Sequence, residues 1–304
     1  MSQQPSQSAA EHPGMSPQQQ KPRQPSSSSQ RVLTSIAVII PVFSLLALGE
    51  GFVGFMLLVP PMILALEWSV MASRVDGTSA TGSAGGAPAL DLPSGAVLFL
   101  CVALPVYLAT TGQELAAWGG IGLSMLAILI YFGFRSRDAG KAASWAVGLL
   151  YCAVPYVCAA SLIGEGASGL YLLMALMSLV WCTDIGAYYV GKRWGRPLPI
   201  VGAISPKKTG LGFLGGIVTG TLGFAYFVAY MPLPWWLVLL APLFSLVAQM
   251  GDLLESFIKR SFGVKDSGTL LPGHGGLMDR MDGFTLLMPL VLFALSMGWL
   301  RVGP

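Results

Sequence analysis

The segment 251–282 concentrates side chains that could perform chemistry. Four polar residues in its first part stand at relative spacings of three, four and seven: Asp252, Glu255, Ser256 and Lys259. This spacing places them on one face of a helix. Farther along, Asp279 and Asp282 are three residues apart, so they project in one direction from a second helix. Carboxylates in this pattern suit a hard divalent cation such as Mg²⁺, which usually keeps substrate phosphates in its shell.

Basic side chains accompany these carboxylates. They are Lys259, Arg260, Lys265 and Arg280, and they could neutralise phosphate oxygens. The intervening stretch 268–276 is rich in glycine and contains His274, the one histidine outside the first 30 residues. A solvated amphipathic helix would explain alternating charge. It explains poorly why acids, bases, a histidine and a glycine-rich turn occur together in so apolar a protein.

A second polar stretch, 184–210, precedes the first. Asp184 ends an otherwise apolar helix, where a carboxylate is unfavourable and becomes a functional candidate. The alternative is a helix-end charge that reaches water. Lys207 and Lys208 follow a Ser-Pro step and precede Thr209, a turn whose hydroxyls and backbone N–H groups suit phosphate oxygens. Taken alone, the two lysines are equally explained by the positive charge usual in cytoplasmic loops.

Composition assigns both stretches to a membrane protein. Of the 304 residues, 54% are hydrophobic and only 10% are charged, whereas soluble domains carry about 25% charged residues. We expect an all-α, polytopic transmembrane bundle with about nine spans. The spans are expected near 32–48, 52–71, 95–111, 115–134, 144–163, 169–187, 211–231, 235–251 and 283–301.

The distribution of basic residues predicts the orientation. With a cytoplasmic N-terminus, every Lys and Arg except Arg301 lies on the cytoplasmic side, as expected for membrane proteins. The external turns carry Glu50, Glu114 and Glu165 and no base. Both polar stretches are therefore expected to face the cytoplasm, in a multi-pass protein of the cell membrane.

The domain organisation follows from the same pattern. Residues 1–30 are mostly Gln, Ser and Pro, which predicts a disordered cytoplasmic tail without a cleavable targeting signal. Residues 31–304 are expected to form one transmembrane catalytic domain, with the motif-bearing part at 184–283. Within the apolar spans, Glu67 is interpreted as lying near the cytoplasmic end of the second span or pairing inside the bundle.

The segment 256–282 resembles the defining pattern of the phosphatidate cytidylyltransferase family, also called CDP-diacylglycerol synthase. The shared elements are Ser, Lys-Arg, Lys-Asp, His-Gly-Gly and Asp-Arg-x-Asp at the usual spacing. The segments 251–255, 184–188 and 205–209 are also similar to motifs of that family. One position departs from it, because members commonly carry an acidic residue where this chain has Leu211.

The resemblance implies the reaction of CTP with phosphatidate in the bilayer to give CDP-diacylglycerol and pyrophosphate. It implies metal ligands at Asp252, Glu255, Asp279 and Asp282, with Mg²⁺ or another hard divalent cation as cofactor. The implied catalytic residues are Asp184, Lys207, Lys208, Ser256, Lys259, Arg260, Lys265, Asp266, His274 and Arg280. No nucleic acid is expected as a partner, and a homodimer is left open.

Three alternatives remain at this point. A CTP-dependent polyprenol or lipid kinase would share the membrane setting and the nucleotide, but it would release CDP instead of pyrophosphate. An ion-coupled transporter also uses intramembrane acids, yet apart from Glu67 nearly every acid here lies in a loop or at a helix end. A relative that keeps the fold without the activity is the third, raised by Leu211.

Overall fold

The computed structural model describes residues 50–75, 91–136, 138–196, 205, 208–264, 267–268 and 276–301. Within these residues the chain is helical, which confirms the expected all-α fold. The elements are α2 (Glu50–Val75), α3 (Leu92–Thr110), α4 (Glu114–Ser136), α5 (Ala139–Gly164), α6 (Ala167–Trp194), α7 (Gly210–Tyr230), the 3-10 helix η2 (Trp235–Leu240), α8 (Ala241–Ser261) and α9 (Met278–Ser296).

Seven helical segments in the described part of the chain are long and apolar enough to cross a membrane. They are α2 to α7 and the continuous run of η2 and α8. This number indicates an integral membrane protein. The helix α9 is not among the seven, and the span expected at 32–48 lies outside the described residues. The count of nine spans and the cytoplasmic N-terminus therefore stay predictions.

Two helix boundaries differ from the expected ones in ways that matter for the site. The helix α6 continues to Trp194 instead of ending near 187. Its last turns carry aromatic and basic side chains, such as Lys192 over the ring of Tyr188 at 5.6 Å, which suit a membrane interface. The helix α9 begins at Met278 instead of 283, so Asp279 and Asp282 belong to its first turns.

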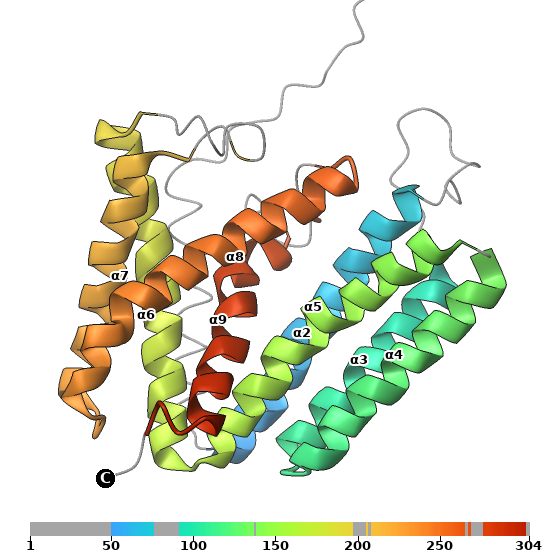
Figure 1. Ribbon diagram of the computed structural model, residues 1–304, viewed down its shortest axis with the longest axis horizontal. Coiled ribbons are helices and arrows are strands. Elements are labelled where there is room, and N and C mark those ends of the chain that lie inside the picture. The colour runs from blue at the N-terminus through green and yellow to red at the C-terminus, as the bar shows by residue number, and fades with distance from the viewer. Residues whose placement is uncertain are drawn as a thin grey trace, which may run out of the picture.

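The helices form two groups that α8 and α9 connect (Figure 1). In one group α2, α3, α4 and α5 pack against one another, and in the other α6 packs along α7. The helix α8 crosses the bundle in contact with α6, α7 and α9, while α9 lies between the groups and also contacts α5. The two helices that carry most of the motif residues thus lie at the junction of the bundle.

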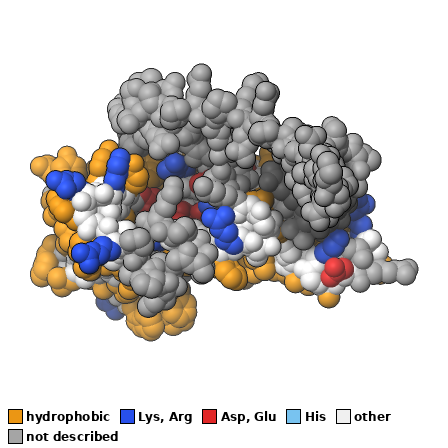
Figure 2. All heavy atoms as spheres, turned by 90° about the horizontal axis from the view of Figure 1, so that it is seen from above, with side chains coloured by type: hydrophobic (Ala, Val, Ile, Leu, Met, Phe, Trp, Pro, Cys, Tyr) orange, Lys and Arg blue, Asp and Glu red, His pale blue; other side chains and the backbone are white. Residues whose placement is uncertain are grey.

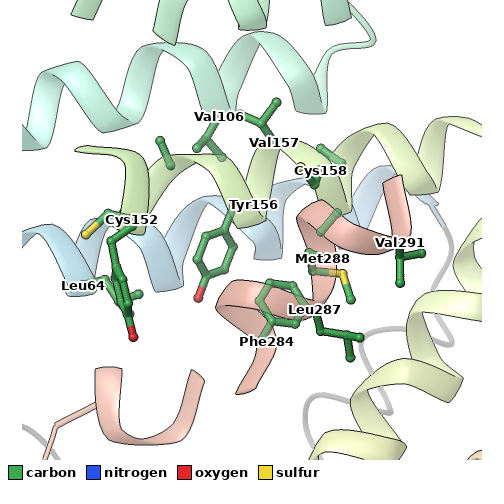
Figure 3. Close-up of a cluster of buried hydrophobic side chains, with 14 of the residues drawn as sticks. Leu64, Val106, Cys152, Tyr156, Val157, Cys158, Phe284, Leu287, Met288 and Val291 are labelled. Carbon is green, nitrogen blue, oxygen red and sulfur yellow. The ribbon is translucent and has the colours of Figure 1, made fainter. Parts of the chain in front are cut away.

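The core of this junction is built on α5. Figure 3 shows Tyr156 of α5 beside Phe284 of α9, with ring centroids 5.4 Å apart, and Leu64 of α2 close by. All three side chains are buried. Because lipid is as apolar as these side chains, close packing holds the helices together more than removal from water does.

Glycines allow the helices that position the site to approach closely. On α8, a Cβ built at Gly251 would lie 2.4 Å from the carbonyl oxygen of Asp282 on α9. On α6, a Cβ at Gly186 would overlap Thr219 of α7, whose hydroxyl donates a hydrogen bond of 2.8 Å to the carbonyl of Cys182. Only glycine permits these backbone distances. The first approach brings Asp252 next to Asp282.

Candidate active site

Three carboxylates from α8 and α9 form the centre of the candidate site. Asp252 and Glu255 on α8 and Asp282 on α9 each offer an oxygen, and these oxygens lie within 4.8 Å of one another. Glu255 and Asp282 are buried, with 1% and 5% exposure, and Asp252 is half-buried. Oxygen ligands at this separation fit a hard divalent cation. We refer to the three residues as the carboxylate cluster.

Lys208 connects the loop before α7 to the cluster. Its Nζ lies 2.7 Å from Oδ2 of Asp252 and donates a hydrogen bond of 3.5 Å to the carbonyl of Gln249. The next residue, Thr209, caps α7 by accepting a hydrogen bond from the N–H of Gly212 at 3.0 Å. The cap fixes where α7 begins, so the ammonium group of Lys208 is held at the edge of the carboxylate cluster.

Lys259 bridges the cluster to Asp279. Its Nζ lies 3.2 Å from Oε1 of Glu255 and donates to Oδ1 of Asp279 at 2.5 Å. The other oxygen of Asp279 accepts from the N–H of Gly276 at 3.0 Å. Asp279 therefore uses both oxygens within the protein and is not part of the three-residue cluster. Its expected role as a metal ligand stays a prediction.

The pKa values of the two aspartates at the start of α9, outside the seven candidate spans, shift in opposite directions. Burial raises the pKa of Asp282 well above its usual value, and neighbouring negative charges raise it further; these come from Asp184, Asp252 and Glu255. Burial also opposes ionisation of Asp279, but hydrogen bonds with Glu255 and Lys259 outweigh it and hold that pKa below its usual value. Asp279 is thus stabilised as an anion, whereas burial and its acidic neighbours disfavour the charged form of Asp282.

Among the described residues, carboxylates outnumber cationic side chains around the cluster. Five carboxylates interact there, those of Asp184, Asp252, Glu255, Asp279 and Asp282. In the described part of the chain, their cationic neighbours are Lys208, Lys259 and Arg280. Because burial and mutual repulsion oppose the ionisation of these carboxylates, a bound divalent cation would favour their ionised forms. Figure 2 shows acidic side chains between groups of Lys and Arg side chains on the face seen from above.

The remaining expected site residues occupy varied positions. Ser256 is half-buried on α8, and Arg280 is exposed on α9. Arg260 is exposed and donates to the carbonyl of Val264 at 3.4 Å. Leu211 is about half exposed in the first turn of α7. Four expected residues lie outside the described residues: Lys207, Lys265, Asp266 and His274.

Two buried residues that contact the helices of the site carry weak signals in the sequence. Gln249 lies one turn before Asp252, is buried, and donates to the carbonyl of Phe213 at 3.2 Å, which ties α8 to α7. A lone amide in an apolar helix was its signal. Glu67 on α2 accepts two backbone hydrogen bonds at the start of α9; the sequence left open whether it lies near the cytoplasmic end of its span or pairs inside the bundle.

Comparison with known proteins gives consistent matches. The model of the cytidylyltransferase family matches residues 29–297. Phosphatidate cytidylyltransferase of Bacillus subtilis is 46% identical over 132 residues, which are 42% of this chain and 49% of that protein. The protein of the same name from Brucella melitensis is 43% identical over 160 residues, or 52% and 57% of the two chains.

A third relative, phosphatidate cytidylyltransferase of Staphylococcus aureus, is 44% identical over 128 residues, which are 41% of this chain and 49% of that protein. The chain thus spans about half the length of the curated relatives it matches.

Proposed function

This chain belongs to the cytidylyltransferase family, and from that membership we propose that it transfers the cytidylyl group of CTP to phosphatidate. The products are CDP-diacylglycerol and pyrophosphate, used in phospholipid synthesis. The carboxylate cluster supports this proposal, since three buried or half-buried carboxylates with lysines at their edge suit a divalent cation and the phosphates of a nucleotide. The names of the relatives, all phosphatidate cytidylyltransferases, support the choice of the lipid.

The reaction requires positioning and charge stabilisation more than covalent catalysis. A phosphate oxygen of phosphatidate attacks the α-phosphorus of CTP, the bond from that phosphorus to the bridging oxygen breaks, and pyrophosphate leaves with the electron pair. Charge spreads over the phosphoryl oxygens during the transfer. The attacking phosphate is already largely ionised at neutral pH, so no general base is essential.

The side chains of the site have different proposed roles in this reaction. Asp252, Glu255 and Asp282 would hold Mg²⁺ or another hard divalent cation, which when bound supplies positive charge to the triphosphate. Lys208 lies at the edge of the cluster, where its ammonium group can contact a phosphate oxygen. Lys259 is already engaged by two carboxylates, so it orients Glu255 and Asp279.

The proposed orientation places this site on the cytoplasmic side of the cell membrane. The end of α6, the start of α7 and the end of α8 lie on the same side of the bundle (Figure 1). A lipid headgroup would then enter sideways at the interface, and CTP would enter from the cytoplasm. CTP and phosphatidate are thus the proposed partners of this site.

The test follows both products of the reaction. Purified protein is incubated with CTP labelled in the cytidine and in the γ-phosphate, Mg²⁺ and vesicles that each contain one lipid: phosphatidate, phosphatidylserine or a polyprenol. We expect pyrophosphate and a cytidine-labelled lipid with phosphatidate alone. Release of CDP with a lipid that carries the γ-phosphate would identify a kinase and refute the proposal. No turnover with any lipid would refute it as well.

A further inference from the structure

The carboxylate of Glu67 contacts the beginning of α9 from α2, 210 positions earlier in the chain. Its Oε1 accepts a hydrogen bond of 2.8 Å from the N–H of Leu277, and its Oε2 accepts one of 2.8 Å from the N–H of Met278. The hydroxyl of Ser267 donates to Oε2 at 3.2 Å. Glu67 is 4% exposed, so three hydrogen bonds to one buried carboxylate form the Glu67 contact site.

Two glycines allow the backbone to reach this carboxylate. A Cβ built at Gly276 would lie 2.7 Å from both oxygens of Glu67, and one at Gly268 would lie 3.0 Å from Oε1. Both distances are shorter than ordinary van der Waals contact, so a side chain at Gly276 would displace the carboxylate. The contact site is therefore shaped around a carboxylate at this position.

The neighbouring residue, Trp68, fixes the helix from which Glu67 projects. Its buried indole packs edge-on against Phe262, which caps the end of α8, with ring centroids 5.4 Å apart. It also occupies the space at Gly148 of α5, where a Cβ would lie 2.7 Å from indole carbons. This section of α2 therefore has fixed contacts with both α5 and α8.

A carboxylate at this place stabilises a defined position of α9. The first N–H groups of a helix have no partner within the helix, and the N-terminus carries partial positive charge. Glu67 supplies acceptors and negative charge to two of these groups. Asp279 lies one residue beyond Met278, and Asp282 lies one turn later. The contact site thus fixes the part of α9 that completes the carboxylate cluster.

We propose that Glu67 is a positioning residue of the active site: by anchoring the start of α9 to α2, it holds Asp282 against Asp252 and Glu255. The inference rests on the proposed function for its catalytic consequence, and on the contacts of α9 alone for its structural part. Catalytic groups must be held within about 0.5 Å of their productive geometry. Loss of the anchor therefore weakens cation binding without removing any ligand.

The experiment compares Glu67→Gln with the matched control Glu114→Gln, in which the same change is made at an exposed carboxylate in the first turn of α4. Glu67→Gln keeps the size of the side chain but places an amide NH₂ against backbone N–H groups. Two quantities are measured on the full chain in lipid nanodiscs: hydrogen exchange of peptides that cover 276–281, and cytidylyl transfer as a function of Mg²⁺ concentration.

For Glu67→Gln we expect faster hydrogen exchange at residues 277 and 278. We also expect the Mg²⁺ concentration for half-maximal activity to rise about 10- to 100-fold, which is the usual effect of losing a residue that orients metal ligands. Glu67→Asp keeps the charge on a shorter side chain, so its exchange rates and its Mg²⁺ requirement should lie between those of Glu67→Gln and the unaltered protein. Glu114→Gln should match the unaltered protein in both measurements. An unchanged Mg²⁺ requirement in folded Glu67→Gln would overturn the inference.

Two further experimental outcomes would also decide the inference. If the unaltered protein transfers no cytidylyl group, the proposed function fails, and the exchange data still decide whether Glu67 anchors α9: unchanged exchange refutes the anchor and faster exchange supports it. If Glu67→Gln does not fold, Ser267→Ala removes one of the three hydrogen bonds and leaves Glu67 in place. A raised Mg²⁺ requirement in Ser267→Ala supports the inference, and an unaltered one overturns it.

Discussion

Substitution of Gly251 by Ala tests whether the contact between α8 and α9 sets the geometry of the carboxylate cluster. The added Cβ would lie 2.4 Å from the carbonyl oxygen of Asp282, whereas ordinary contact begins at 3.4 Å. The obstacle is backbone, which cannot rotate away as a side chain can. The two helices must therefore separate by about 1 Å at the residue that contributes to the cluster, and a displacement of about 1 Å can lower the rate about 100-fold.

The assay is steady-state cytidylyl transfer to phosphatidate at saturating Mg²⁺. Gly119→Ala is the matched control, because a Cβ at Gly119 on α4 would meet nothing within 4 Å. We expect Gly251→Ala to insert into the membrane and to lose about 100-fold in kcat, while Gly119→Ala retains the original rate. A folded Gly251→Ala protein with unaltered kcat would show that the cluster does not depend on this helix contact.

Three further substitutions address single side chains. Asp282→Asn should lower the rate of cytidylyl transfer at least about 100-fold, since the loss of a residue that only orients a metal ligand already lowers activity about 10- to 100-fold. The control Asp138→Asn retains a capping side chain at the start of α5 and should keep the original rate. Equal rates in the two variants would contradict a metal role for Asp282. Lys208→Met should raise KM for CTP about 10- to 100-fold, the effect of one charged hydrogen bond, and an unchanged KM in a titration of CTP would exclude contact with the nucleotide. Leu211→Glu should leave activity with phosphatidate intact or higher, and a large loss in the same assay would show that the site depends on the leucine.

Residues on one helix were predictable as a group, because their spacing decides which face they share. The positions of Asp252 and Glu255 on α8 agree with that prediction, and the cluster adds Asp282 from a second helix. Asp279 and Asp282 were expected to project in the same direction, but only Asp282 belongs to the cluster. Asp279 lies in the first turn of α9, where the N–H of Gly276 and the ammonium group of Lys259 bind it first.

Contacts between distant segments could not be read from spacing. The sequence marks Glu67 as an unusual acid in an apolar span, but two of its three partners are backbone N–H groups, which every residue except proline carries. Gly251 likewise gives no local sign that a carbonyl oxygen of another helix fills the space beside it. Both depend on how α2, α8 and α9 pack, which is a property of the whole bundle.

The contacts at the start of α9 also restrict how the protein can recognise an anion. Many proteins bind phosphate with the free N–H groups of a helix N-terminus, but here Asp279 and Glu67 accept from the N–H groups of Gly276, Leu277 and Met278. These three N–H groups are therefore not free to bind a phosphate. Under the proposed function, cationic side chains such as Lys208 and a divalent cation would contact the triphosphate instead, so affinity for CTP should fall as ionic strength rises.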